Sequence, residues 1–333
     1  MKTRIISCML CCLLAAFTLP ALRAADPFVN QASGGFTWIG QGQAVPILAD
    51  MAEDPGVLRA IESLRLDAVA VTGVTVPLWD LDWEDHALLP ATGSRTVLLI
   101  GTLEHNRWIK ELASLGLLDA KQLEGCTEKY LLTTIEYPFE GVDQAVVIAG
   151  SDKRGAIYGI YELSNQMGVS PWYYWADVPP RKTDRVIIAP GTYTDGEPAV
   201  RYRGIFLNDE WPALGNWATE TFGGLNSKFY EKVFELVLRL KGNFMWPAMW
   251  NSAFYDDDPL NGPLANEMGV VMGTSHHEPM GQAQQDWKRR GTGEWDYTKN
   301  ASVLKKFWQE GRNAAKTGNP SLPWGCAVTV TRP

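Results

Sequence analysis

Short apolar runs alternate with longer amphipathic stretches between residues 36 and 195. The apolar runs have the β-branched composition of buried strands, and they are residues 68–72, 97–101, 130–137, 145–149 and 186–189. The amphipathic stretches predict helices and are residues 104–118 and 153–167. Gly168 follows the second stretch as a helix stop signal. Strands that alternate with helices predict an α/β layer for this part of the chain.

The pattern changes after residues 190–198, whose Gly, Thr and Pro content predicts a linker between two domains. Beyond this linker, the predicted strands are residues 202–207, 243–249, 269–275 and 327–331, and the predicted helices are residues 227–240 and 300–316. Polar residues cluster directly after the strands. A repeated strand–helix unit of this kind predicts a (β/α)₈ TIM barrel, whose active site lies at the C-terminal ends of its strands.

These patterns divide the chain into residues 1–24, an N-terminal α/β domain at 25–195, and a barrel domain at 196–333. A length of 333 residues allows roughly two domains. Only 133 residues follow from Arg201 onward, whereas a (β/α)₈ barrel takes about 250. We therefore expect the first half of a barrel, in a chain that is truncated or shifted in reading frame near its end.

The first 24 residues have the layout of a secretory signal peptide. Lys2 and Arg4 precede an apolar stretch at residues 5–19, and Ala24 supplies a small residue at the cut. The apolar stretch is shorter than the about 20 residues of a transmembrane helix. An uncleaved anchor is the alternative. We expect cleavage after Ala24 and a secreted or periplasmic protein.

Composition and charge narrow the range of partners. Apolar residues make up 46% of the chain and charged residues 20%, which is typical of a globular protein. A net charge of −8 argues against nucleic acid and against an anionic membrane surface, and we expect no membrane insertion. Only Cys126 and Cys326 lie beyond the predicted signal peptide, which is too few cysteines for a disulfide scaffold. We expect both thiols to be free.

Two adjacent acids follow the first strand of the predicted barrel. Asn208, Asp209 and Glu210 come directly after an apolar run, so their side chains belong at the barrel mouth. Carboxyl groups in different environments can hold a proton on one and a charge on the other, which suits general acid–base chemistry on a glycosidic bond. Asp209 and Glu210 are therefore candidate catalytic residues, and Asn208 is a candidate substrate-binding residue. A loop cap with a surface ion pair is the alternative.

A second polar cluster follows the third strand. His276, His277 and Glu278 would lie in a loop at the barrel mouth, where they could contact a substrate. The spacing is not that of a zinc site, because the H-E-x-x-H pattern and a nearby third histidine are missing. We expect these three residues to bind substrate and no metal to be present. Structural hydrogen bonding is the alternative.

Tryptophans gather near the same strand ends. Trp211 and Trp217 flank the acid pair, and Trp246 and Trp250 bracket the end of the second strand. Sugar rings have apolar faces beside hydroxyl groups, so aromatic side chains near carboxylates and amides suit them. Trp246 and Trp250 are candidate substrate-binding residues, although each could belong to the core instead. Nearby amides that could bind hydroxyl groups are Asn216, Asn226, Asn243 and Asn251.

Two other motifs favour structural interpretations. Residues 256–258 are three consecutive aspartates that predict a loop and helix cap, because they lack the spaced oxygen ligands of an EF-hand. Residues 150–155 resemble a phosphate loop but lack the full Walker spacing. We interpret them as a strand-to-helix turn, in which Gly155 and Gly159 let the helix approach its neighbour. No cofactor is expected.

Four long runs resemble glycoside hydrolase family 115, the xylan α-1,2-glucuronidases. The runs are RGIFLNDE at residues 203–210, KGNFMWPAMW at 241–250, MGTSHHEPM at 272–280 and GAIYGIYEL at 155–163. The resemblance implies a non-catalytic α/β domain followed by a catalytic (β/α)₈ barrel. It implies that (4-O-methyl)-D-glucuronic acid is removed from glucuronoxylan or xylo-oligosaccharides, with inversion and without an organic cofactor. It also places Asp209, with Glu210, in the active-site pocket and His276 in the uronate-binding region.

Several alternatives remain at the level of sequence. An inverting pair of carboxyl groups needs a separation of about 6.5–9.5 Å, so a second catalytic carboxylate is expected from another strand than that of Asp209 and Glu210. The early stop also fits an inactive fragment or a carbohydrate-binding module. Adjacent Asp and Glu after a strand also occur in hexosaminidase-like barrels. A homodimer of a full-length form is compatible with the family resemblance.

Overall fold

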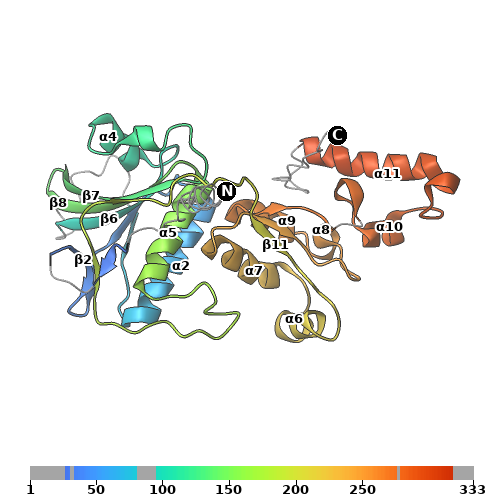
Figure 1. Ribbon diagram of the computed structural model, residues 1–333, viewed down its shortest axis with the longest axis horizontal. Helices are drawn as coiled ribbons and strands as arrows, with labels where there is room; N and C mark the ends of the chain where they lie inside the picture. Colours follow the sequence, from blue (N-terminus) through green and yellow to red (C-terminus); the bar gives the residue numbers. More distant parts are fainter. Residues whose placement is uncertain (1–26, 31–33, 81–94, 276–277, 318–333) are drawn as a thin grey trace, which may run out of the picture.

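The computed structural model describes residues 27–317, apart from residues 31–33, 81–94 and 276–277 (Figure 1). The predicted signal peptide at 1–24 and the predicted strand at 327–331 lie outside the described residues. The fold is mixed α/β, as predicted, and contains a six-stranded, a four-stranded and a three-stranded sheet. Within the described part of the chain, no helix is both long and apolar enough to span a membrane.

The six-stranded sheet has the strand order β10-β7-β8-β6-β4-β5. Its strands are β4 (Ile47–Ala49), β5 (Leu78–Asp80), β6 (Thr96–Thr102), β7 (Tyr130–Phe139), β8 (Val142–Gly150) and β10 (Thr192–Tyr193). Neighbours from β5 to β8 run parallel, and β7 and β10 add antiparallel pairs. The parallel strands have apolar side chains on both faces of the sheet, because helices cover both faces. β10 lies inside the predicted linker, so part of that segment belongs to this sheet.

Helices α2 (Pro55–Thr72) and α5 (Lys153–Met167) cover one face of this sheet. Helix α4 (Arg107–Ser114) covers the other face, where Trp108 and Leu112 pack on Leu99, and a short 3₁₀ turn, η2 (Ala120–Gln122), follows it (Figure 1). A smaller sheet with the order β1-β9-β2-β3 flanks this layer. Its strands are β1 (Val29–Asn30), β2 (Phe36–Gly40), β3 (Gln43–Ala44) and β9 (Val186–Ile188).

The predicted strand at residues 68–72 is wrong, because these residues form the last part of α2. Asp54 caps the start of this helix by accepting a hydrogen bond from the backbone N–H of Gly56 at 2.8 Å. Gly73 ends it with a φ of 76°. Ala68 and Val71 are buried, whereas Val69 is 39% exposed, which is the spacing of a helix face. Tertiary packing therefore overrode the β preference of a short run.

Helix α5 has the predicted bounds, Lys153–Met167, and Gly168 ends it in the left-handed conformation. Asp152 caps its start by accepting from the N–H of Gly155 at 2.8 Å. The predicted close approach is also confirmed, because a Cβ atom at Gly159 would lie 2.7 Å from the Ile148 side chain. The predicted helix at 104–118 is shortened to α4. The strands predicted at 97–101, 130–137, 145–149 and 186–189 are confirmed.

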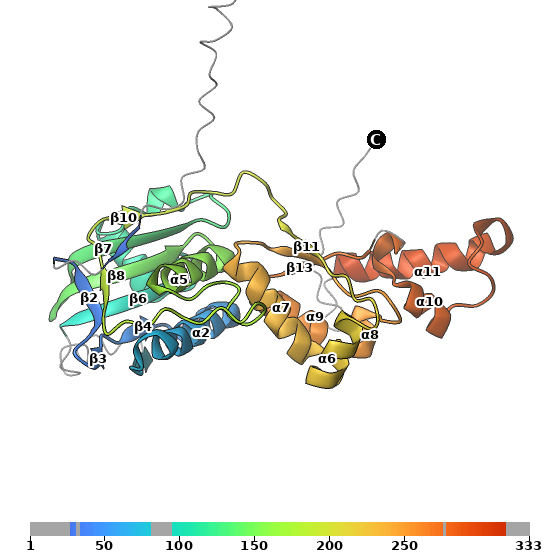
Figure 2. The ribbon, with the colours of Figure 1, turned by 60° about the horizontal axis from the view of Figure 1, so that its bottom comes forward.

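Three parallel strands form the third sheet, β11 (Gly204–Phe206), β12 (Phe244–Trp246) and β13 (Val271–Met272). Helices α6 (Leu214–Phe222) and α7 (Ser227–Arg239) connect the first pair, and α8 (Phe254–Asp257) and α9 (Asn261–Met268) connect the second. After β13 come η3 (Pro279–Gly281), α10 (Gln284–Arg290) and α11 (Tyr297–Thr317). Asn226 caps the start of α7. Figure 2 shows α6 and α7 on the side of this sheet that faces α2 and α5.

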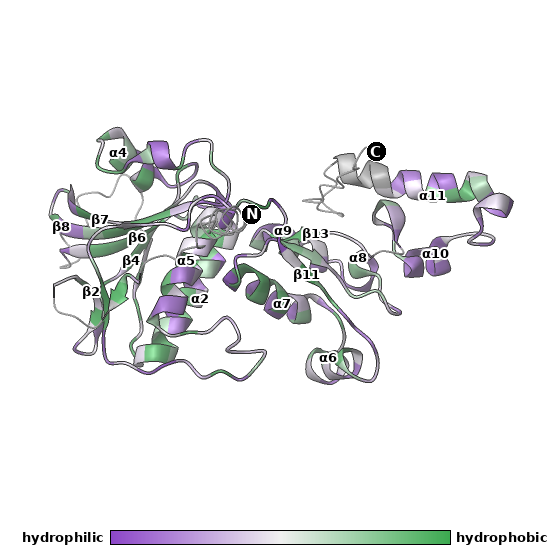
Figure 3. Ribbon diagram, in the orientation of Figure 1, coloured by the Kyte–Doolittle hydropathy of each residue, from purple (hydrophilic) through white to green (hydrophobic). Residues whose placement is uncertain are grey.

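One continuous apolar core joins the two parts of the molecule. It includes Ile148 of β8, Tyr158 of α5, Phe234 of α7 and Met245 of β12. Helix α7 packs on α5, and α9 packs on α2. Figure 3 shows the apolar character of α7 beside this junction and the polar character of α10, which lies far from it. The N-terminal layer thus packs against the helices α7 and α9 that accompany the three-stranded sheet.

Candidate active site

The C-terminal ends of β11, β12 and β13 lie at one edge of the three-stranded sheet, because the strands are parallel. Phe206 pairs with Trp246, and Met245 pairs with Met272. The loops that leave these strands carry the polar clusters singled out in the sequence. The structure therefore brings residues 208–210, 247–252, 273–275 and Glu278 to the same end of the sheet.

Asp209 is fully buried. Its Oδ1 accepts a hydrogen bond from the backbone N–H of Met249 at 3.1 Å, and its Oδ2 accepts one from Trp250 at 2.9 Å. Burial raises the pKa of the Asp209 carboxyl, the two amide donors oppose that rise, and the charge of Glu210 adds to it. The carboxylate thus ties the loop after β11 to the loop after β12.

The two neighbours of Asp209 are in a different environment. Asn208 and Glu210 are exposed at the same strand end. Asp209 and Glu210 therefore differ sharply in burial, as expected for adjacent residues at the end of a strand, whose side chains point to opposite sides. Of these two acids, only Glu210 is open to a ligand from the solvent.

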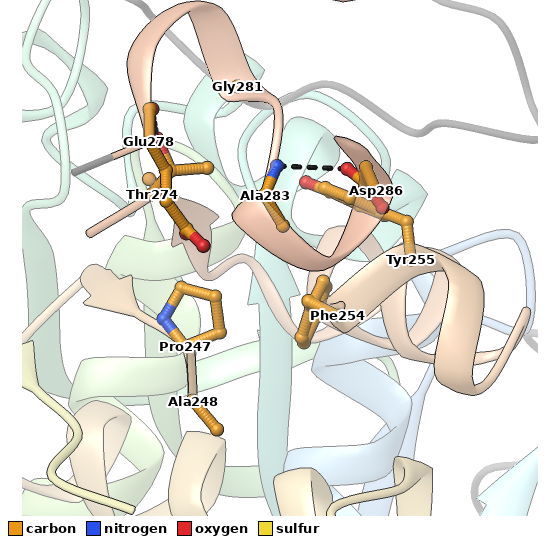
Figure 4. A pocket seen from close by; sticks show the side chains of 10 residues that line it. Pro247, Ala248, Phe254, Tyr255, Thr274, Glu278, Gly281, Ala283 and Asp286 are labelled. Carbon is orange, nitrogen blue, oxygen red and sulfur yellow. Dashed lines mark hydrogen bonds between the residues drawn. The ribbon is translucent and has the colours of Figure 1, made fainter. Parts of the chain in front are cut away.

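Glu278 is buried after β13 and lines a small cavity with Thr274, Phe254, Tyr255 and Asp286 (Figure 4). Its Oε1 accepts a hydrogen bond from the N–H of Gln284 at 3.0 Å. Burial raises its pKa to about 7; backbone N–H donors oppose this rise, and the charges of Asp286 and Asp209 add to it. Glu278 can therefore exchange a proton near neutral pH.

Asp286 is a residue of this cavity that sequence reasoning missed. It accepts a hydrogen bond from the N–H of Ala283 at 2.9 Å, and Arg290 lies 3.3 Å from it (Figure 4). Burial raises the pKa of the Asp286 carboxyl. Its sequence position gave no signal beyond that of an acid near the start of a helix.

His276 and His277, both predicted to bind substrate, lie outside the described residues. Among the residues that the structure does describe, no group of three or more His, Cys, Asp or Glu side chains is arranged to hold a metal ion. The loop predicted for the three aspartates is wrong for Asp256 and Asp257, which form the last turn of α8, whereas Asp258 directly follows this helix. Asp258 accepts from the N–H of Ser227 at 2.8 Å, and Asp257 accepts from Ala253 at 2.8 Å.

A larger groove of about 370 Å³ lies between the loops after β11 and β12. Trp211 and Trp250 line it and are 53% and 51% exposed. Its polar lining residues are Asn226, Asn251, Ser252 and Asp257. This volume is within the range of small-ligand sites, and exposed indole rings beside amides and a carboxylate can hold a sugar ring.

Trp246, the other tryptophan predicted to bind substrate, is not among the residues that line this groove. It is half-buried in β12, and its ring packs against Phe206 with a centroid distance of 5.6 Å and an interplanar angle of 71°. Trp217, which lies in α6, packs against Trp175 and Phe222. The tryptophans of this region therefore divide between packing and lining of the groove.

Comparison with known proteins finds a family model that matches the second part of the chain. Residues 195–325 match the model of glycosyl hydrolase family 115. The fold is similar to a solved structure described as a novel family GH115 4-O-methyl-α-glucuronidase, BtGH115A, with specificity for decorated arabinogalactans. The TM-score is 0.70 at 28% identity, covering 86% of this chain and 35% of that chain. This chain thus spans about a third of the length of that relative.

Two other solved structures are similar at a lower level. A chitobiase of Flavobacterium johnsoniae has a TM-score of 0.40 at 12% identity, covering 74% of this chain and 33% of that chain. A β-hexosaminidase of Streptomyces plicatus has a TM-score of 0.41 at 13% identity, covering 75% and 44%. These likenesses are too weak to assign a function. No curated protein matches the chain in sequence.

Proposed function

Since residues 195–325 match the model of glycosyl hydrolase family 115, we propose that the chain belongs to this family and carries part of the active site of an α-glucuronidase. The family match is the observation that carries this proposal. The proposed substrate is glucuronoxylan or a xylo-oligosaccharide, from which a (4-O-methyl)-D-glucuronic acid side chain is removed. The groove between Trp211 and Trp250 would receive the sugar at the strand ends where such barrels hold their active sites.

The proposed mechanism is acid–base hydrolysis with inversion. Glu278, whose pKa is raised to about 7, would give a proton to the leaving oxygen. Glu210, exposed after β11, would activate the water. Glu210 and Glu278 follow two different strands of the same sheet, β11 and β13. A pair on different strands suits inversion, which needs carboxyl groups about 6.5–9.5 Å apart with room for a water.

Hydrolysis is tested with xylotriose that carries one 4-O-methyl-glucuronic acid side chain. We expect release of the uronic acid, first as the β-anomer, which proton NMR distinguishes from the α-anomer of a retaining enzyme. We expect Glu278→Gln to lower the rate by at least about 100-fold, the scale of one general acid. Release of the α-anomer first would contradict inversion, and an unchanged rate in Glu278→Gln would contradict the role of Glu278.

A second candidate substrate is a decorated arabinogalactan, because BtGH115A is described with that specificity. The same assay with an arabinogalactan oligosaccharide that ends in 4-O-methyl-glucuronic acid compares the two directly. If kcat/KM is higher on this oligosaccharide than on the substituted xylotriose, arabinogalactan and not xylan is the substrate. Binding of either sugar by calorimetry without release would instead favour the carbohydrate-binding alternative.

A further inference from the structure

We propose that Asp209 is a positioning residue, which holds the Trp250 side of the groove in place through the backbone of residues 249 and 250. The inference deepens the proposed function, on which it rests only for the nature of the sugar. It assigns to Asp209 a different task from the acid–base role that the sequence predicted. The task follows from how both of its carboxylate oxygens are used.

The carboxylate oxygens of Asp209 are each engaged by a main-chain donor. Oδ1 accepts from Met249 at 3.1 Å, and Oδ2 accepts from Trp250 at 2.9 Å. Hydrogen bonds to a charged acceptor are about twice as strong as neutral ones. Two of them on consecutive amides fix the direction of the chain where it leaves β12, and with it the point from which the Trp250 side chain extends.

Asp209 is also shielded from the place where a substrate would lie. The residue is fully buried, and it is not among the residues that line the groove. Trp250, by contrast, is 51% exposed and forms one of its walls. A general acid or base must come within hydrogen-bond reach of the reacting oxygen. Glu210, which is exposed at the same strand end, is open to such an approach, whereas Asp209 is not.

The loop after β12 makes a second buried hydrogen bond next to those of Asp209, and removing it is a matched control for Asp209→Asn. The hydroxyl of the buried Tyr230 lies 3.2 Å from the N–H of Ala248 and accepts its hydrogen bond. Asn251 adopts a left-handed φ of 56°, which turns the chain sharply after Trp250. Tyr230→Phe removes one buried hydrogen bond from this loop without touching the amides of residues 249 and 250.

The test compares Asp209→Asn, Tyr230→Phe, Trp250→Ala and the Asp209→Asn/Trp250→Ala double variant. Asn keeps the shape and one acceptor but places an NH₂ group against one of the two amides. Hydrogen exchange of the amides of residues 249 and 250 is measured first. Affinity for the uronic-acid-substituted xylotriose is then measured by calorimetry at several pH values, with circular dichroism as the check on folding.

We expect Asp209→Asn to speed exchange of both amides by at least about tenfold and to weaken sugar binding by about tenfold, equally at all pH values tested. In the Trp250→Ala background the same change should cost almost no further affinity, because Asp209 acts through Trp250. Tyr230→Phe should leave exchange at residues 249 and 250 unchanged.

Unchanged exchange in Asp209→Asn would overturn the proposal, as would an affinity loss that adds fully to that of Trp250→Ala. The exchange measurement needs no sugar, so it judges the positioning role even if the substrate is wrong. If wild-type protein binds neither uronic-acid oligosaccharide, the proposed function fails, while the exchange result stands by itself. If Asp209→Asn does not fold, Asp209→Glu is measured in the same way, since its longer side chain displaces the two acceptors.

Discussion

At the scale of single residues, burial separates the roles of acids that look alike in the sequence. Asp209 and Glu210 are neighbours, yet one is fully buried against backbone amides and the other is exposed. Glu278 is buried like Asp209, accepts a hydrogen bond from Gln284 at its Oε1 and lies near Asp286. These surroundings raise its pKa to about 7, so Glu278 changes charge near neutral pH.

This raised pKa of Glu278 predicts a pH-dependent stability. The folded protein holds the Glu278 proton up to about pH 7, whereas the unfolded chain loses it near pH 4.5. The stabilising contribution is therefore full below about pH 4.5 and is lost as the pH rises through about 7. As the pH rises from 5 to 8, the free energy of unfolding should fall less in Glu278→Gln than in wild type, because Gln does not titrate. We expect the difference between the two decreases to be about 1–2 kcal/mol, allowing for solvent screening.

Urea unfolding of both proteins at pH 5, 6, 7 and 8 measures this difference. Asp286 and Asp209 also have raised pKa values and interact with Glu278, so the difference reports the titration of Glu278 together with its coupling to these two acids. Parallel pH profiles for the two proteins would show that Glu278 titrates at its ordinary value.

At the scale of elements, close packing fixes the helices more firmly than helix propensity does. Helix α5 packs on β7 and β8, and Gly159 lies at this interface. A Cβ atom there would lie 2.7 Å from Ile148 Cγ2 and 3.1 Å from the Tyr130 ring. The two neighbours are themselves buried, so neither can move away freely.

Gly159→Ala should therefore destabilise the protein, even though alanine is the better helix former by about 1 kcal/mol. Overpacking of a filled core costs about 1–3 kcal/mol, which exceeds the gain in propensity. Thermal unfolding followed by circular dichroism gives the sign directly. A stabilised Gly159→Ala protein would mean that α5 can shift away from the sheet.

At the scale of the whole molecule, a buried charge network joins the N-terminal layer to the strands of the site. Arg239, at the end of α7, pairs with Asp67 of α2 at 2.9 Å and with Glu235 at 2.8 Å. Its guanidinium lies over the rings of Tyr161 and Tyr173, 4.4 Å and 5.0 Å from their centroids. The arginine thereby connects α2, α5 and α7 around one buried point.

Arg239→Ala should cost about 3–5 kcal/mol, because it leaves the carboxylates of Asp67 and Glu235 buried without their partner. The matched control is Arg95→Ala, which removes an Arg–carboxylate pair with Asp143 on the surface. We expect the control to melt close to wild type and Arg239→Ala to melt far lower in a single transition. Two separate transitions would show that the layers unfold independently.

The sequence by itself determined much of the α/β alternation. The bounds of α5, the strands β6–β8, and the placement of polar clusters after β11, β12 and β13 follow from local periodicity and turn residues. These signals are local because hydrogen bonding within a helix and alternation along a strand involve near neighbours. The four runs carried the resemblance to glycoside hydrolase family 115, and three of them lie within residues 195–325, which match the model of that family.

Only the tertiary structure decided which face each residue meets. Residues 68–72 form part of a helix. Trp250 lines a groove, whereas Trp246 packs against Phe206. Asp209 accepts hydrogen bonds from amides about 40 residues further along the chain. Burial and hydrogen-bond partners of this kind arise from contacts between distant segments. No local pattern encodes them, and they set whether a carboxylate at a strand end transfers a proton or holds a loop in place.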